Sequence, residues 1–287
     1  MSKGALVIGA SRGIGRQIAL TLSRNNYKVG VAAKTAISSD TLPGSIHTVT
    51  ADIEAEAGRG TPIVCNVRSE EDIKGAVQTC MKEFGRLDVA VYNAGAILWD
   101  KVINTNTKRF DLMNEVNARG AYIMVQEVLP HFLEQKSGKI ILVSPPIYNR
   151  FFKGKTTYAM SKVGMTVLVH GLANELRGTG VSISALWPAT VIRSHVTDKI
   201  NVPLKLMRTP DIFADAVVKI VEDPTERLNG QALIDEDYLR TTGLSDFTKY
   251  RCDSEHEPPR MMPKIFPSLF VEEEDQNLRI PNNKSQL

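Results

Sequence analysis

The stretch Ala5-Leu-Val-Ile8 leads directly into Gly9-Ala-Ser-Arg-Gly13-Ile-Gly15, and the helical pattern Arg16-Gln-Ile-Ala-Leu20 follows it. Glycines let the backbone approach a pyrophosphate closely, and the free N–H groups at the start of a helix attract the anion. The position between a strand and a helix makes this pattern far more specific than loose glycines. The stretch therefore predicts a nucleotide-binding turn, and the alternative is a tight βα turn without a ligand.

The same alternation of short apolar runs and longer helical patterns continues to about residue 238, which is typical of βαβ units. Strands are expected at residues 5–8, 28–33, 62–66, 89–92, 139–143, 182–186 and 231–234. Helices are expected at residues 15–24, 70–84, 108–134, 157–177 and 211–222, with a short helix at 48–57. The pattern predicts an α/β fold of the Rossmann type, a three-layer sandwich with a seven-stranded parallel sheet.

We expect one domain, residues 1–238, followed by an extended C-terminal tail, residues 239–287. From Leu239 onward the pattern dissolves into polar residues, prolines and the acidic run at 272–275. Such a composition is typical of an extended arm and not of a second core.

Composition points to a small-molecule ligand. The 287 residues are 43% hydrophobic and 23% charged, with a net charge of +3 that is too slight to favour nucleic acid or a membrane surface. The three cysteines form no CxxC pair, and neither they nor the five scattered histidines have metal-ligand spacing. We expect reduced thiols in an intracellular protein, no metal site, no signal peptide and no membrane span.

The chain ends in Ser285-Gln-Leu287, one residue away from the peroxisomal address Ser-Lys-Leu. A peroxisomal location is therefore one expectation. The alternatives are the cytoplasm or the mitochondrion, with the tripeptide as the end of a disordered tail.

The end of the second expected strand, Val31-Ala-Ala-Lys34, indicates which dinucleotide binds. An NAD site places a carboxylate there for the ribose hydroxyl, whereas a 2′-phosphate requires a cation. No acid is present, and Arg12 in the glycine turn is a second candidate cation. The residues favour NADP(H), and the alternative for Lys34 is a solvated loop lysine.

Tyr158 and Lys162 stand four residues apart in an expected helix and therefore on one face of it. A neighbouring ammonium favours tyrosinate, so the pair is expected to exchange a proton near neutrality. The alternative is a solvated tyrosine beside a helix lysine.

These pieces together resemble the short-chain dehydrogenase/reductase family. The glycine turn, Asn93-Ala-Gly95, Asn117, the pair Tyr158-x-x-x-Lys162 and the turn Pro188-Ala-Thr190 occur in the family's order. Within the family, Ser144-Pro-Pro146 and Ala185-Leu-Trp-Pro188 resemble the hydroxysteroid dehydrogenase-like 2 group. Members of that group can carry a sterol-carrier domain, which we do not expect in this chain.

The resemblance implies that Tyr158, Lys162, Asn117 and Ser144 are catalytic. It also implies the cofactor-binding residues, which are Gly9, Ser11, Arg12, Gly13, Ile14, Gly15, Lys34, Asn66, Val67, Asn93, Ala94, Gly95, Pro188 and Thr190, with Tyr158 and Lys162. The chain departs from the family at Pro145, which stands where the catalytic serine is usual, so that Ser144 is the nearest substitute. Tyr92 likewise replaces an asparagine before Asn93.

The function implied is an NADP(H)-dependent oxidoreductase that interconverts a carbonyl and an alcohol on an apolar small molecule. Substrate contacts are expected from residues 96–102, 151–155 and 191–207, which follow strand ends. The proline at the serine position leaves a catalytically silent NADPH-binding regulatory or scaffold protein as the alternative, and a hydratase or epimerase on the same fold as a third. Helices 108–134 and 157–177 are expected to pair with a second subunit in a homodimer or homotetramer.

Overall fold

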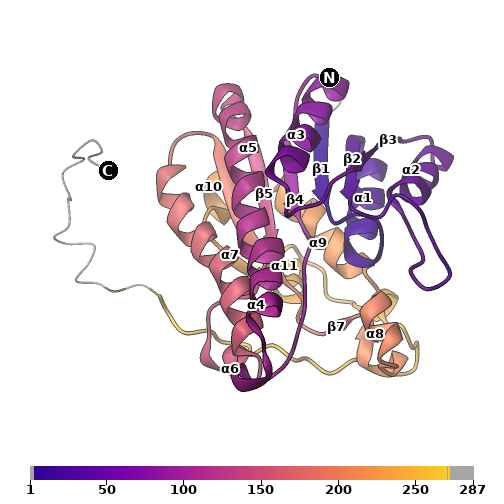
Figure 1. Cartoon of the computed structure of the whole chain (residues 1–287), viewed down its shortest axis with the longest axis vertical. Helices are drawn as coiled ribbons and strands as arrows, with labels where there is room; N and C mark the ends of the chain where they lie inside the picture. The colour runs from indigo at the N-terminus through magenta and orange to yellow at the C-terminus, as the bar shows by residue number, and fades with distance from the viewer. Residues whose placement is uncertain (1–2, 270, 272–287) are drawn as a thin grey trace.

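A parallel sheet of seven strands runs through the centre of the computed structural model, which describes residues 3–269 and 271 (Figure 1). Its strands are β1 (Lys3–Ile8), β2 (Tyr27–Ala33), β3 (Arg59–Val64), β4 (Val89–Tyr92), β5 (Gly138–Val143), β6 (Val181–Trp187) and β9 (Ala232–Ile234). Their spatial order is β3-β2-β1-β4-β5-β6-β9. The predicted fold is confirmed, although β3 begins three residues before the expected start at residue 62.

Helices cover both faces of the sheet because strand side chains alternate between the faces. Val7 and Val31 share one buried cluster with α1 (Gly13–Arg24), α2 (Ile46–Ala55), α9 (Asp211–Glu222) and α11 (Asp235–Thr241). Leu6 and Ala32 share the other cluster with α3 (Glu70–Phe84), α5 (Gly120–Gln135) and α7 (Thr156–Glu175). The three layers leave the carboxyl ends of the strands as the edge at which a ligand site is expected.

The long helix expected at residues 108–134 is interrupted. It consists of α4 (Thr107–Asn114), a π-helical turn at Glu115–Arg119 and then α5. The buried hydroxyl of Tyr92 donates to the carbonyl oxygen of Val116 over 2.5 Å, which gives that carbonyl a partner outside the helix. A π turn inserts one extra residue into the helix. Apolar periodicity does not reveal such an insertion.

The chain beyond residue 238 stays packed for longer than expected. The boundary at residue 238 falls inside α11, and Phe247 and Tyr250 are buried in the same cluster as α1. Two aromatic anchors among polar residues hold this part of the chain against the domain. The acidic run at 272–275 and the C-terminal tripeptide lie outside the described residues.

A small two-stranded parallel sheet joins β7 (Val191–Ile192) to β8 (Met207–Arg208) beyond the end of β6. The remaining elements are α6 (Asn149–Phe152), α8 (His195–Lys199), α10 (Thr225–Leu228) and the short 3₁₀ turns Val102–Asn104, Leu204–Leu206 and Thr248–Tyr250. Within the described part of the chain, every helix is too short or too polar to cross a membrane.

Candidate active site

The glycine turn is held against β4 by close backbone contacts. Gly9 has a φ of 86°, and a Cβ there would lie 2.5 Å from the amide nitrogen of Ala94. A Cβ at Gly15 would lie 2.1 Å from the carbonyl oxygen of Gly9, which also accepts a hydrogen bond from Asn93 Nδ2 over 2.9 Å. Asn93 thus fixes the turn from the neighbouring strand, and both glycines are required by space.

Helix α1 begins at this turn with its first N–H groups uncapped by a side chain. Arg12 is the N-cap residue in an extended conformation, and the first turn of α1 contains no acid. Gly13 takes a φ of 54°, in the left-handed region that glycine tolerates. The free donors and the positive end of the helix dipole suit a diphosphate. The buried Ser11 precedes them.

At the adenosine end, Lys34 and Arg12 have different surroundings. Lys34 follows β2 and is exposed. The Arg12 guanidinium donates to the carbonyl oxygens of Pro43 and Gly44, over 3.0 Å from Nε and 2.7 Å from Nη2. Arg12 therefore holds the loop before α2, and Lys34 is the freer of the two predicted cations.

The two residues expected beside adenine follow β3. Asn66 Oδ1 accepts a hydrogen bond from the backbone amide of Arg68 over 3.3 Å. The backbone amide of Asn66 donates to Asp72 Oδ2 over 2.8 Å. Val67 is buried. The structure places both at the same strand edge as the glycine turn.

Tyr158 and Lys162 lie on α7, and each is only 3% exposed. Lys162 Nζ donates to the carbonyl oxygen of Val143, the last residue of β5, over 2.9 Å. Burial raises the pKa of the Tyr158 phenol and lowers the pKa of Lys162 to about 7. The expectation that the ammonium lowers the pKa of the phenol is therefore wrong for the protein alone, because desolvation dominates at both groups.

Asn117 lies in the π turn and is fully buried. Its Oδ1 accepts from the amide of Ala96 over 2.9 Å, while Nδ2 donates to the carbonyl oxygen of Ala96 over 3.0 Å and to Ser161 Oγ over 2.9 Å. Ser161 in turn donates to the carbonyl oxygen of Tyr158 over 2.8 Å. The asparagine thus ties the loop after β4 to the first turn of α7. Nothing in the sequence marked Ser161 for this link.

Ser144 is also fully buried, and its hydroxyl contacts Thr166 on α7. Thr166 Oγ1 bonds Ser144 Oγ over 2.9 Å and donates to the carbonyl oxygen of Pro145 over 2.7 Å. Thr166 stands eight residues after Tyr158, about 12 Å along a helix axis. The structure therefore joins Ser144 to Thr166 and not to Tyr158.

The turn after β6 carries the last predicted cofactor residues. The amide of Ala189 donates to Asp235 Oδ1 over 2.8 Å. Thr190 is 1% exposed, and its hydroxyl has no hydrogen-bond partner among the described residues. Buried hydroxyl groups are usually paired, so an unpaired one at this edge suits an amide group of a ligand. With Gly95, whose Cβ would lie 3.5 Å from Lys162 Nζ, the turn fits a nicotinamide nucleotide.

Apolar side chains enclose the phenol. The ring centroid of Phe151 lies 6.2 Å from that of Tyr158 and 5.7 Å from that of Trp187. Ala96, Leu98 and Phe152 from the predicted substrate segments pack against the same cluster, whereas Trp99 is 62% exposed.

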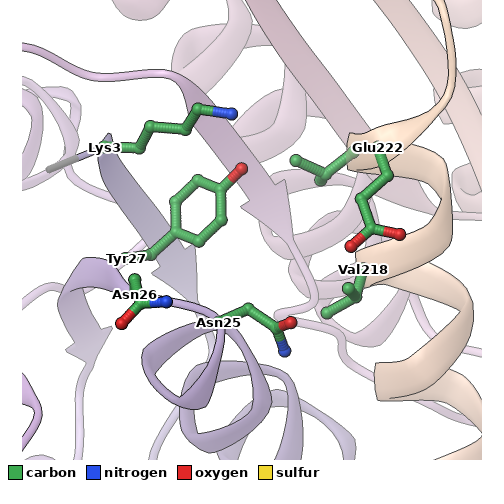
Figure 2. A pocket seen from close by; sticks show the side chains of 7 residues that line it. Lys3, Asn25, Asn26, Tyr27, Val218 and Glu222 are labelled. Atoms are coloured by element: carbon green, nitrogen blue, oxygen red, sulfur yellow. The ribbon is translucent and has the colours of Figure 1, made fainter.

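A different hollow, of about 310 Å³, lies at the starts of β1 and β2, and Figure 2 shows the side chains that line it. Lys3, Tyr27 and Glu222 line it, and burial raises the pKa of Tyr27 to about 12. It lies at the end of the strands remote from the glycine turn. We therefore do not assign it to the candidate site.

No group of three possible metal ligands occurs within residues 3–269 and 271.

Comparison with known proteins gives consistent matches. The family model described as short chain dehydrogenase matches residues 3–203. Hydroxysteroid dehydrogenase-like protein 2 from Danio rerio is 37% identical over 276 residues, 95% of this chain. That match spans 64% of the relative, so the chain covers less than two thirds of its length.

Solved structures agree on the fold. A crystal structure from Xanthomonas campestris superposes with a TM-score of 0.84 at 37% identity, covering 94% of this chain and 97% of that chain. A 7α-hydroxysteroid dehydrogenase complexed with NADH and 7-oxo glycochenodeoxycholic acid superposes with a TM-score of 0.71 at 22% identity, covering 81% of this chain and 92% of that chain. The second similarity concerns the fold alone.

Proposed function

Because the chain belongs to the short-chain dehydrogenase family, we propose that it is an NADP(H)-dependent oxidoreductase that interconverts a carbonyl and an alcohol on an apolar small molecule. One arrangement carries the proposal. The buried pair Tyr158 and Lys162 lies at the same sheet edge as the uncapped start of α1 and the unpaired hydroxyl of Thr190.

The choice of NADP(H) rests on charge at the end of β2. Lys34 is exposed there, and no carboxylate stands in its place. A 2′-phosphate gains a cation from Lys34, whereas the ribose hydroxyls of NAD would find no acidic acceptor. The 7α-hydroxysteroid dehydrogenase of similar fold is complexed with NADH, and titration of this chain with both cofactors tests the choice.

The cofactor, when bound, supplies a hydride to the carbonyl carbon. Tyr158 gives its phenolic proton to the developing alkoxide, and its raised pKa keeps that proton in place until the oxygen becomes basic. Lys162 has donors left over from its bond to Val143, and these suit the ribose hydroxyls. Asn117 holds the start of α7 in place.

A hydrogen bond from Ser144 to the carbonyl oxygen of the substrate stays a prediction. The serine hydroxyl would have to exchange Thr166 for the substrate.

NADPH consumption with a panel of aldehydes and ketones tests the proposal. Tyr158→Phe keeps the ring and removes the proton donor, so turnover should fall by about 10²-fold or more while NADPH still binds. Tyr27→Phe is the matched control, because Tyr27 lines the hollow at the strand ends remote from the glycine turn. Equal turnover by Tyr158→Phe and the wild type would rule the mechanism out.

Pro145 and the Ser144–Thr166 bond favour a second candidate, a catalytically silent NADPH-binding regulatory or scaffold protein. That function predicts tight NADPH binding without consumption of the cofactor by any carbonyl compound. The same panel separates the two, because binding and turnover are measured on one sample.

We also propose a homodimer or homotetramer in which α5 and α7 pair with a second subunit. Tyr122 on α5 and Met160 and Val167 on α7 are more than half exposed although they are large and apolar. Light scattering of the wild type and of Val167→Glu measures the state. A monomeric wild type would contradict this part of the proposal.

A further inference from the structure

The segment of residues 260–266, called the strap from here on, crosses the candidate active site. In Figure 1 this part of the yellow chain runs across the end of the molecule where α6 and α8 lie. The amides of Met261 and Met262 both donate to the carbonyl oxygen of Ala189, over 2.8 and 3.1 Å. The strap is thus bonded to the turn that carries Thr190.

Side-chain contacts fix both ends of the strap. Arg260 pairs through two nitrogens with both carboxylate oxygens of Asp237, each over 2.6 Å. Arg150 Nη2 donates to the carbonyl oxygen of Met261 over 2.6 Å. The ring of Phe266 meets that of Tyr148 edge-on, with 5.3 Å between centroids. These contacts come from α11 and from the segment before α7.

The two methionines of the strap differ in direction. Met261 is 44% exposed, whereas Met262 is 9% exposed and belongs to the apolar cluster that contains Tyr158 and Phe151. The Tyr148 hydroxyl donates to Met262 Sδ over 3.2 Å. A thioether is a weak acceptor and a flexible apolar side chain, so it can be replaced or displaced at small cost.

We propose that Met262 is a specificity-determining residue, whose side chain occupies the space beside Tyr158 that the apolar part of a carbonyl substrate takes. This role for Met262 rests on the proposed function, because Met262 would line the substrate pocket of that same site. The phenol of Tyr158 is only 3% exposed, so a substrate reaches it by displacing part of the surrounding apolar cluster. Met262 is the unbranched, flexible member of that cluster contributed by the strap.

The backbone of the strap connects Met262 to the proposed cofactor site. Ala189 accepts from the strap at its carbonyl oxygen and donates to Asp235 at its amide. The position of Met262 is therefore set by the same turn that would hold the nicotinamide. The strap lies beyond residue 203, where the match to the family model ends.

The test compares butanal with decanal as substrates, and 1-butanol with 1-decanol as ligands of the NADPH-loaded protein. In Met262→Ala the ratio of kcat/KM for decanal over butanal should rise by about tenfold, and the affinity ratio of the alcohols should rise in parallel. Met261→Ala removes the same side chain from the same strap and should leave both ratios within about twofold of the wild type. Met262→Leu conserves volume and should resemble the wild type.

The readouts separate the two ideas. If Met262→Ala turns over both aldehydes with unchanged ratios of kcat/KM and of alcohol affinity, Met262 does not determine specificity. If no turnover is found but the alcohol affinities still change in Met262→Ala, the proposed function is wrong and the role of Met262 in lining the pocket is supported. If Met262→Ala does not fold, Met262→Phe fills the same space and should lower both ratios instead.

Discussion

Lys162 bonds the carbonyl oxygen of Val143 through Nζ over 2.9 Å, and this is its only oxygen partner among the described residues. An ammonium has three N–H donors and prefers an oxygen partner for each. Burial with one such partner lowers the pKa of Lys162 to about 7. The lysine therefore costs stability in the protein alone, and its remaining donors suit a ligand.

Lys162→Met should stabilise the fold and abolish turnover. Between about pH 7 and pH 10 the unfolded chain holds a proton that the native lysine has lost, so wild-type stability rises by about 1 kcal/mol per pH unit. The advantage of Lys162→Met is then largest near pH 7 and shrinks toward pH 10. Urea unfolding across this range measures it. The exposed Lys108→Met is the control, and a constant difference would contradict the burial cost.

Lys34→Ala should weaken NADPH binding and spare NADH. The variant loses the cation proposed for the 2′-phosphate, so the Kd for NADPH should rise about tenfold or more, with a smaller effect at high salt. Lys28→Ala removes a lysine from the other end of the same strand and serves as the control. Fluorescence titration with both cofactors gives the ratio. Equal losses for NADPH and NADH would remove Lys34 from the 2′-phosphate site.

Local spacing explains what the sequence could predict. The glycine turn depends on residues that are neighbours in the chain, and a Cβ at Gly15 would meet the Gly9 carbonyl oxygen at 2.1 Å. Tyr158 and Lys162 are brought together by one turn of helix. These features follow from backbone geometry and need no knowledge of distant segments.

The remaining features depend on contacts between distant segments. The direction of Ser144 is decided by Thr166, 22 residues away. Met262 reaches the site because the strap returns to Ala189, more than 70 residues earlier in the chain. In the sequence the strap belongs to a stretch of polar residues and prolines without a helical or strand period, and a period analysis does not place such a segment.

The π turn gives a test of packing. A Cβ at Gly120 would lie 2.1 Å from the hydroxyl of Tyr92, so Gly120→Ala should lower the free energy of unfolding by about 1–3 kcal/mol. Gly75→Ala is the matched control, because Gly75 also lies in a helix and has nothing within 4 Å of the added Cβ. It should stabilise by about 0.5–1 kcal/mol, since alanine is the better helix former. Thermal unfolding measures both variants. A change in stability of the same sign in Gly120→Ala and Gly75→Ala would refute this account.

Asp235 gives the opposite pH dependence to Lys162. Its carboxyl is fully buried and accepts from the amides of Ala189 and Glu236, but Oδ2 has no partner among the described residues. Burial raises its pKa to about 7, against the lowering effect of those two hydrogen bonds. The folded state then holds a proton that the unfolded chain releases, and the contribution to stability is lost as the pH rises from about 4 to about 7.

Asp235→Asn removes the buried charge and keeps an acceptor for Ala189. Its stability relative to the wild type should therefore increase by about 1 kcal/mol per pH unit from about pH 4 to about pH 7 and stay constant above. The exposed Asp40→Asn is the control and should show no such trend. Asp235→Ala also removes the acceptor for the Ala189 amide, so it should lose NADPH affinity where Asp235→Asn does not. Equal NADPH affinities in Asp235→Ala and Asp235→Asn would show that Asp235 does not affect cofactor binding. The hydrogen bond from the Ala189 amide is the contact through which Asp235 is expected to act.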